Sequence, residues 1–204
     1  MYRDPLSMVD YLAARMISSP LCLYDCDVPV DGSTAFVVSV AEHATSMPAP
    51  PVYIDAVGSA MRTRFSWDQQ EELASMAATG VAEHLWSRTS LTPADVDFAQ
   101  LYDGFSILAV VWLEALGFCK FGEGGSFIDG GARIALDGEL PLNTAGGQLS
   151  GGRLHGFGLI HEAVLQLRGQ ATGRQLDHPS VGVVGNGGGP IAGAMLLTAH
   201  PSEP

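Results

Sequence analysis

A glycine-rich stretch from Leu142 to Gly158 constrains the fold of this 204-residue chain more than any other feature. It carries six glycines among polar and ionisable side chains, between an apolar strand-like start and a helical run at 159–168. Glycine permits positive φ and lets the backbone approach a ligand closely. A strand that breaks into glycines and then opens a helix is typical of a site at the carboxyl end of a sheet. Arg153 and His155 stand where such a site would place its chemistry.

Two other stretches have the same character, and we expect them to meet the first one. Leu101–Ser106 reads Leu-Tyr-Asp-Gly-Phe-Ser and follows an apolar strand pattern. Residues 185–190 read Gly-Asn-Gly-Gly-Gly-Pro and follow another. We call these three polar, glycine-bearing stretches (101–106, 142–158 and 185–190) the three corners. Because each follows an apolar strand pattern, they predict one shared site at the rim of the fold.

The order of apolar patterns predicts an α/β fold, layered α-β-α, with a mostly parallel five-stranded sheet. The expected strands are 52–57, 96–102, 140–144, 181–184 and 191–199, and the expected helices are 69–86, 105–118 and 159–168. A proline-rich linker at 47–51 separates a domain of residues 52–204 from residues 1–46. In 1–46 we expect a short helix after Ser7 and a buried strand at 31–40.

Composition excludes several classes of function. The formal net charge is -12, and the only lysine is Lys120, so a phosphate-binding nucleic-acid surface is not expected. The longest apolar run, 107–113, falls far short of the roughly 20 residues that span a membrane. Neither the three cysteines nor the histidine spacing forms a metal pattern, so we expect no metal site. An odd cysteine count without a signal peptide favours the cytoplasm.

The three corners resemble motifs in the carboxyl-terminal half of the thiolase superfamily. Tyr102-Asp103-Gly104-Phe105 stands where thiolases carry an Asn-Glu-Ala-Phe turn, and 142–152 resembles their Asn-x-x-Gly-Gly…Gly-His-Pro loop. Residues 185–189 resemble their Cys-x-Gly-Gly-Gly loop, and 31–35 resembles the last strand of the amino-terminal half. The resemblance implies a thiolase-like fold. Residues 52–204 would be the carboxyl-terminal domain, and 1–46 the end of the amino-terminal half, with a loop-domain helix and last strand.

This chain departs from thiolases at the reacting groups. Gly185 or Asn186 stands where thiolases have the acid/base cysteine, and Arg153-Leu154 replaces His-Pro, with His155 displaced by two. The variant pattern looks most like the thiolase-like lipid-transfer proteins, which are similar to the thiolase domain of sterol carrier protein X. That subgroup includes retro-aldolases that shorten sterol side chains held as CoA thioesters. The resemblance implies an acyl-CoA substrate without a further cofactor, a homodimer, and a partner of the OB-fold, zinc-ribbon acyl-CoA-binding class.

Retro-aldol cleavage needs a base for the hydroxyl proton and donors for the thioester enolate. Tyr102 is the expected acid/base, with Asp103 orienting it or a water, and His155 is the alternative base. The expected substrate-binding residues are Arg153, Asn143, Gly146, Gly147, Asn186, Gly187, Gly188 and Gly189.

Structural roles remain open for the same residues. Tyr102 could be a strand-end residue at the edge of the core, and Asp103 could be the N-cap of the next helix. His155 could be a structural residue that holds its loop in place. Arg153 fits a partner of a carboxylate or a loop carbonyl.

Three functions remain open as well: a carbon–carbon lyase, a non-catalytic acyl-CoA or lipid carrier, and an acetyl-CoA acyltransferase whose nucleophilic cysteine lies in a missing half. We expect a fragment or one subunit of a split protein, because half a thiolase would expose the apolar 105–118 helix, which fits core or interface.

Overall fold

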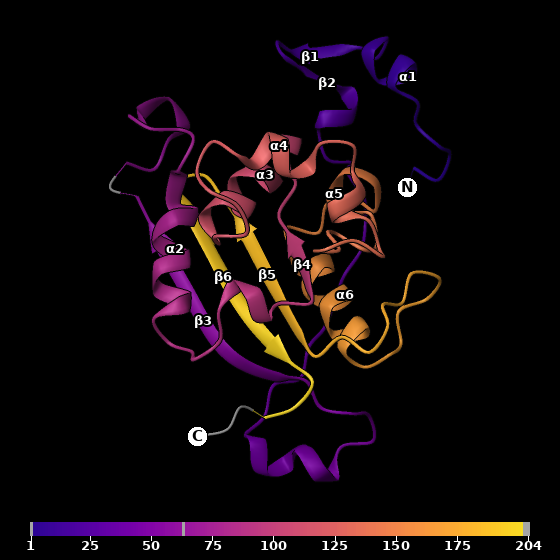
Figure 1. Ribbon diagram of the computed structural model, residues 1–204, viewed down its shortest axis with the longest axis vertical. Coiled ribbons are helices and arrows are strands. Elements are labelled where there is room, and N and C mark those ends of the chain that lie inside the picture. Colours follow the sequence, from indigo (N-terminus) through magenta and orange to yellow (C-terminus); the bar gives the residue numbers. More distant parts are fainter. Residues whose placement is uncertain (1, 63, 202–204) are drawn as a thin grey trace.

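The computed structural model describes residues 2–62 and 64–201, so the outermost ends of the two predicted domains lie outside the described residues. Its centre is one four-stranded sheet (Figure 1). The strand order is β3 (Tyr53–Met61), β6 (Ile191–Thr198), β5 (Val181–Gly187) and β4 (Phe98–Leu101). Strand β6 runs antiparallel to both β3 and β5, whereas β4 and β5 are parallel.

Helices cover both faces of this sheet, which confirms the layered α/β class. Helices α2 (Met76–Trp86) and α3 (Ser106–Ala115) pack on one face, and α6 (Phe157–Leu167) packs on the other. Because side chains alternate along a strand, Val183 enters the α2–α3 core while its neighbour Val184 enters the α6 core. Both valines are almost fully buried, as strands covered on both faces require.

The sheet differs from the prediction in strand number and direction. Four strands form it among the described residues, not five, and one of its three pairings is parallel. The predicted strand at 140–144 contributes a single parallel bridge, Leu142 to Ala99, because Asn143 turns the chain there with φ 48°. Strands β5 and β6 are antiparallel because only a tight turn joins them.

The amino-terminal segment begins as predicted. Helix α1 (Met8–Leu12) starts after Ser7, whose hydroxyl accepts the Asp10 amide N–H at 3.1 Å. A small hairpin of β1 (Met16–Ser18) and β2 (Leu21–Cys22) follows.

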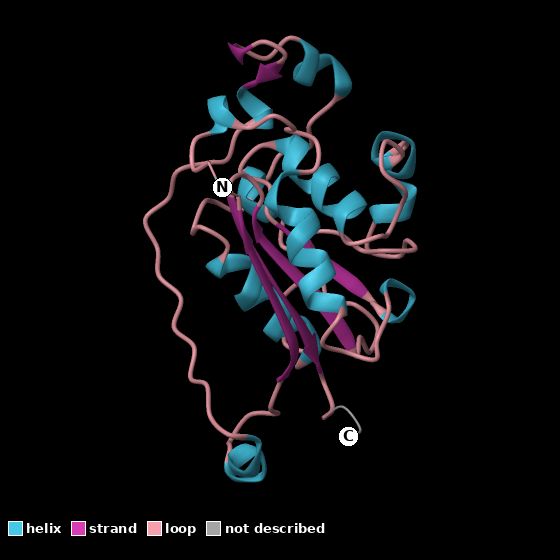
Figure 2. Cartoon of the chain, turned by 90° about the vertical axis from the view of Figure 1, so that its left-hand side faces the viewer, coloured by secondary structure: helices cyan, strands magenta, loops and turns pink. Residues whose placement is uncertain are grey.

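The predicted buried strand at 31–40 is wrong. These residues form an extended strap along the molecule, and Val37 is 93% exposed (Figure 2). A strand exists only through ladder hydrogen bonds, and no described strand pairs with this segment.

Helix α3 is buried on one side. Its Leu108, Val111, Trp112 and Leu113 lie in the core, while Ile107 is 50% exposed on the other side. Helix α2 begins at Met76, seven residues later than predicted.

The remaining helices are short. Helices α4 (Gly124–Ile128) and α5 (Gly147–Ser150) lie in the loops. Short 3-10 helices occupy Leu23–Asp25, Ala41–Ser46, Trp67–Gln69, Pro93–Asp95 and Ala132–Ile134. In the described part of the chain, no helix is long and apolar enough to cross a membrane.

Candidate active site

The three predicted corners meet at one hollow in the surface. Tyr102, His155 and Asn186 line it together with Gly187 and residues 191–193. Tyr102 directly follows β4, and Asn186 lies near the carboxyl end of β5. Because these neighbouring strands are parallel, their carboxyl ends reach the same edge of the sheet. The Tyr102 amide N–H donates to the Gly185 carbonyl at 2.9 Å, which fixes the two corners to each other.

A side-chain hydrogen bond attaches the third corner. Asn186 Nδ2 donates to the main-chain carbonyl oxygen of His155 at 3.0 Å. His155 has φ 49°, a left-handed conformation that histidine adopts more readily than most residues. A Cβ atom at Gly156 would overlap the Asn186 side chain, so the close approach of the two corners requires glycine there.

A second hollow adjoins the first at His155. Its walls are the strap-side residues Pro29, Val30 and 32–34 on one side, and 153–155 with Phe157 on the other. Two backbone hydrogen bonds hold the chain just before the strap against the body of the molecule. The Val28 N–H donates to the Gln148 carbonyl, and the Arg153 N–H donates to the Val28 carbonyl.

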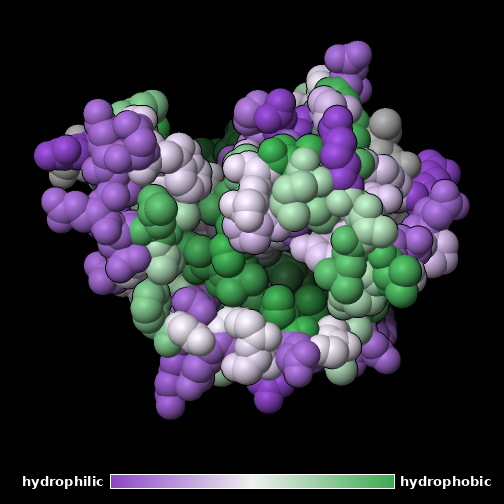
Figure 3. Space-filling view, turned by 90° about the horizontal axis from the view of Figure 1, so that it is seen from above, coloured by the Kyte–Doolittle hydropathy of each residue, from purple (hydrophilic) through white to green (hydrophobic). Residues whose placement is uncertain are grey.

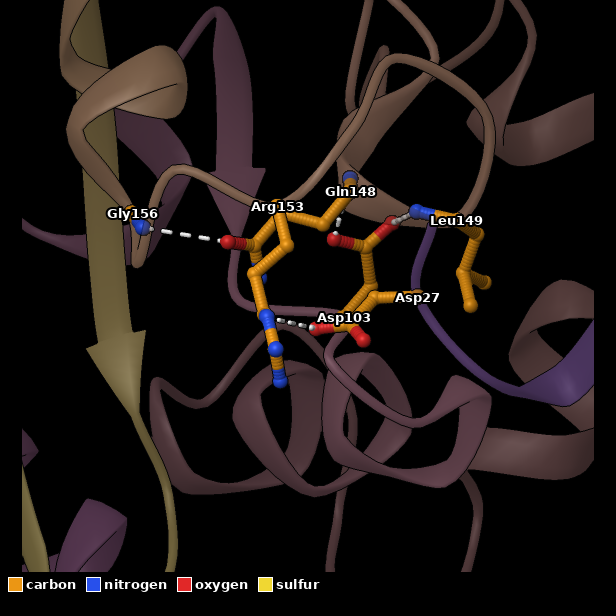
Figure 4. Close-up of polar contacts among 6 residues, drawn as sticks. All are labelled: Asp27, Asp103, Gln148, Leu149, Arg153 and Gly156. Carbon is orange, nitrogen blue, oxygen red and sulfur yellow. Dashed lines mark hydrogen bonds and ion pairs between the residues drawn. The ribbon is translucent and has the colours of Figure 1, made fainter. Parts of the chain in front are cut away.

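Arg153 pairs with a carboxylate, one of its predicted alternatives. Its Nε lies 3.7 Å from Asp27 Oδ2 (Figure 4). The Arg153 side chain remains 45% exposed, whereas that of Asp27 is 14% exposed. The guanidinium is therefore anchored at one end and open to solvent at the other. A substrate contact for Arg153 stays a prediction.

Asp103 is buried and holds the loop that carries the glycines. It is 3% exposed, and its carboxylate accepts the backbone N–H of Gln148 at 2.8 Å and of Leu149 at 3.4 Å (Figure 4). Burial raises the pKa of Asp103, although these N–H donors act against the rise. The alternative that Asp103 caps the next helix is wrong, because Phe105 is the N-cap of α3 and the carboxylate faces α5.

Asn143 is likewise engaged by the protein. Its Oδ1 accepts the Leu101 N–H at 2.7 Å, and its Nδ2 donates to the Leu101 carbonyl at 2.9 Å. The side-chain amide thus replaces a neighbouring strand at the end of β4. A Cβ atom at Gly147 would overlap the Asp103 carboxylate, and Gly146 (φ 93°) is the N-cap of α5. Substrate contacts for Asn143, Gly146 and Gly147 stay predictions that no contact here supports.

The hairpin from 185 to 189 is braced from within. Gly187 N–H donates to Asn186 Oδ1 at 2.9 Å, and Gly188 N–H donates to the Ile191 carbonyl at 3.3 Å. Trp112 Nε1 donates to the Gly187 carbonyl at 2.9 Å. Both backbone N–H groups already have partners, so Gly187 and Gly188, two of the predicted substrate-binding residues, have no free N–H to donate to a substrate.

Tyr102 has the perturbed hydroxyl of the site. Burial raises its pKa, and the charges of Asp27 and Asp103 add to the rise. The nearby side-chain amide of Gln148 and the charge of Arg153 oppose the rise in the Tyr102 pKa. Sequence reasoning missed Gln148, whose one visible signal was a polar side chain between Gly147 and Leu149. Tyr102 is thus a neutral hydroxyl at neutral pH, which can donate a proton, and only its phenolate form can accept one.

Neither Cys26 nor Cys119 is an activated thiol. Burial raises the pKa of Cys26 and of Cys119, and nearby carboxylates add to the rise. A raised pKa disfavours the thiolate, which is the nucleophilic form. Among the described residues, no group of three or more His, Cys, Asp or Glu side chains could hold a metal ion.

Comparisons with known proteins agree with this geometry. Residues 58–198 match the family described as Thiolase C-terminal domain-like. The chain is 38% identical, over 96% of its length and 51% of the relative, to 17-hydroxy-3-oxo-4-pregnene-20-carboxyl-CoA lyase of Mycobacterium tuberculosis. It is 35% identical, over 86% of its length and 46% of the relative, to an acetyl-CoA acetyltransferase of Methanothermobacter thermautotrophicus.

A solved structure extends the likeness to three dimensions. The Ltp2-ChsH2(DUF35) aldolase superposes with a TM-score of 0.87 and 33% identity, over 98% of this chain and 53% of that one. The chain spans about half the length of the curated relatives it matches. The resemblance expected from the three corners is confirmed: the chain belongs to the thiolase superfamily, in the family of thiolase C-terminal domain-like proteins.

Proposed function

We propose that this chain forms part of an acyl-CoA carbon–carbon lyase, a retro-aldolase that cleaves a β-hydroxyacyl-CoA derived from a sterol side chain or a similar lipid. The observation that carries the proposal is that Tyr102 and His155 line one hollow, while the thiols of Cys26 and Cys119 are not activated. The residues of this chain that line the hollow therefore offer acid/base groups, and neither of these two thiols has the character of the nucleophile that a thiolase reaction needs. The names of the lyase and the aldolase that this chain resembles support the same reaction.

The reaction can be written with these groups. Tyr102 in its phenolate form takes the proton of the β-hydroxyl and becomes the neutral phenol, with His155 as the alternative base. The oxygen's electron pair forms the ketone as the bond between the α- and β-carbons breaks. The electron pair of that bond passes into the thioester as an enolate. Tyr102 then returns the proton to the α-carbon, which releases the shortened acyl-CoA. Asp103 contributes by holding α5 in place, not by touching the substrate.

Arg153 suits the phosphate groups of CoA. Arg153 lines the second hollow with a half-exposed side chain, in a chain with a strong negative charge. Asp27 holds its Nε and leaves the outer nitrogens to a ligand. We assign the strap-side hollow to the CoA end of the substrate and the Tyr102 hollow to the acyl end. No further cofactor is needed for this chemistry.

The same proposal includes a homodimer and a partner of the OB-fold, zinc-ribbon class, in the cytoplasm. Figure 3 shows hydrophobic residues around a hollow on the face seen from above. Elements at that end carry exposed apolar side chains: Met8 (70%), Val9 (76%), Leu12 (74%), Met16 (57%) and Ile107 (50%). Large exposed apolar surface usually marks an interface. The solved aldolase that this chain resembles carries a two-part name, Ltp2-ChsH2(DUF35), which supports a partner protein.

The deciding experiment is an assay of the full protein with a β-hydroxy sterol side-chain CoA ester. We expect release of a ketone and a shorter acyl-CoA, and we expect Tyr102→Phe to slow turnover by roughly 100-fold or more. Cleavage by the Tyr102→Phe variant at the normal rate would remove Tyr102 from the mechanism. The His155→Gln variant reports separately whether the histidine serves as the base.

The acetyl-CoA acetyltransferase relative favours a second candidate, an acyltransferase. That reaction requires a nucleophilic cysteine elsewhere in the full protein. Acetyl transfer to CoA that is lost after thiol alkylation would support it, and tight acyl-CoA binding without either reaction would indicate a carrier.

A further inference from the structure

We propose that Gln148 is a positioning residue for Tyr102, with a side-chain Nε2 that is held ready to donate to the Tyr102 oxygen when that oxygen carries the negative charge. This inference rests on the proposed function of the Tyr102 site and assigns a role to a residue outside the predicted set.

The orientation of the Gln148 side chain is fixed by its neighbours. The residue is 2% exposed. Its backbone N–H donates to Asp103 Oδ1 at 2.8 Å, and its carbonyl accepts the Val28 N–H at 3.1 Å. Its side-chain Oε1 accepts the Gly156 N–H at 3.1 Å (Figure 4). A flipped amide would place NH₂ against that N–H, so Oε1 and Nε2 cannot exchange places.

The other end of the amide is a buried donor with no partner of its own. Nε2 is inaccessible to solvent and makes no hydrogen bond within the described residues. Buried donors without partners are rare in proteins and destabilise the fold, so a retained one calls for a role. The Gln148 side chain nevertheless lies near enough to the Tyr102 hydroxyl to lower the Tyr102 pKa, against the rise caused by burial.

Ionisation of Tyr102 would supply the missing partner. A neutral phenol is both donor and acceptor, whereas a phenolate is an acceptor only and binds a donor more strongly. Each proton transfer through Tyr102 would thus give Nε2 the bond that it lacks at rest. The gain appears when charge develops, which is how a prearranged donor accelerates a reaction.

Gln148 also connects the residues on both sides of the hollow. Its backbone is tied to Asp103, the neighbour of Tyr102, and its side chain is tied to Gly156, the neighbour of His155. One buried amide therefore sets the placement of both proposed bases. Because Gln148 positions the bases and does not bind the substrate, replacing Gln148 should lower kcat more than it changes KM.

The test measures the ionisation of Tyr102 directly, without reference to turnover. Near-ultraviolet titration of each full-length variant is compared with its Tyr102→Phe counterpart, and the difference isolates Tyr102. Gln148→Met keeps the length and removes the donor, so the Tyr102 pKa should rise by about one to two units. Gln148→Glu keeps the acceptor for Gly156 N–H and adds a negative charge, so the rise should be larger.

A matched control separates this effect from general loss of a buried amide. Gln166 is fully buried, and its amide donates to Glu162 and to the Arg174 carbonyl. Gln166→Met should destabilise the fold and leave the Tyr102 titration unchanged. A Tyr102 pKa in folded Gln148→Met equal to that of the parent protein would overturn the inference.

A second measurement needs no Gln148 variant. The side-chain NH₂ resonances of Gln148 should shift as Tyr102 titrates in the parent protein and should stay constant in Tyr102→Phe. Gln148 resonances that do not change as Tyr102 titrates would overturn the inference.

Where the parent protein cleaves the CoA ester, Gln148→Met should lower kcat about 10- to 100-fold. Absence of cleavage in every protein would sink the proposed function, while the titration would still decide the role of Gln148.

Discussion

Asn186 Nδ2 donates to the carbonyl of His155 at 3.0 Å, and this bond joins the end of β5 to the turn before α6. The same side chain accepts the Gly187 N–H through Oδ1. One amide thus braces the hairpin with its oxygen and holds the histidine with its nitrogen.

Asn186→Asp should lose the first of these contacts and keep the second. An aspartate presents only acceptors, so it repels the His155 carbonyl while Oδ1 still serves Gly187. We expect a loss of about 1–3 kcal/mol in unfolding free energy by urea titration. We also expect turnover to fall at least 10-fold, because His155 is no longer held at its left-handed φ. Wild-type kinetics in a folded Asn186→Asp protein would show that the bond does not position the site.

Gly147→Ala should be far more damaging than an alanine at another left-handed glycine. Both Gly147 (φ 59°) and Gly122 (φ 83°) have positive φ, but a Cβ at Gly122 meets nothing within 4 Å, whereas one at Gly147 overlaps Asp103. The Gly122→Ala control should cost roughly 1–2 kcal/mol, and Gly147→Ala roughly 2–5 kcal/mol. Equal losses in chemical denaturation would mean that Asp103 moves aside without cost.

Asp103 should give folding stability an unusual pH dependence. Burial raises its pKa, so the folded state binds this proton more tightly than the unfolded state. Stability from this group is therefore present below the ordinary carboxyl pKa and is lost as pH rises through the raised value. Asp103→Asn cannot titrate, so the wild-type protein's stability relative to the variant should fall as pH rises across that window.

Asp95 supplies the control of opposite sign. Hydrogen bonds from the Thr92 hydroxyl and backbone lower the pKa of Asp95. Its contribution is present above the ordinary value and is lost as pH falls through the lowered one. Urea titrations of Asp103→Asn and Asp95→Asn across acidic pH should show opposite slopes relative to wild type. Parallel slopes would contradict the buried-carboxylate account.

The convergence of the three corners could be predicted from sequence, because it follows from chain geometry alone. Tyr102 and Asn186 each come at the end of an apolar strand, and parallel neighbours end at one edge. Whether a strand-like segment pairs with another strand could not be predicted in this way. Residues 31–40 have a strand's composition, yet strand formation depends on a partner, and none of the described strands pairs with them.

Residue roles that depend on tertiary contacts could not be predicted from the sequence either. Asn143 reads as a ligand-binding residue, but both of its polar atoms serve Leu101. Gln148 reads as an ordinary loop residue, and only its burial and unpartnered nitrogen distinguish it. Sequence indicates which residues can do chemistry, whereas the folded contacts decide which of them remain free to do it.

The last prediction concerns the anchor of the amino-terminal segment. Asp25 is 5% exposed and accepts bonds from Ser106 Oγ at 2.7 Å and from the Tyr11 hydroxyl at 2.9 Å. Burial opposes its ionisation, but the bonds from Ser106, the Cys22 backbone and Tyr11 hold its pKa below the ordinary value. The carboxylate thereby ties α1 to the first turn of α3, four residues beyond Tyr102.

Tyr11 reports on this anchor. Its hydrogen bond to Asp25, followed by burial and the Asp25 charge, raises the pKa of Tyr11 to about 12. Asp25→Asn should return the Tyr11 pKa toward 10.0 and loosen the segment, which hydrogen exchange would detect at α1. Asp10→Asn, which removes a carboxylate that bonds to Ser7, should leave Tyr11 unchanged. A tyrosine titration that is the same in both variants would show that Asp25 does not hold Tyr11.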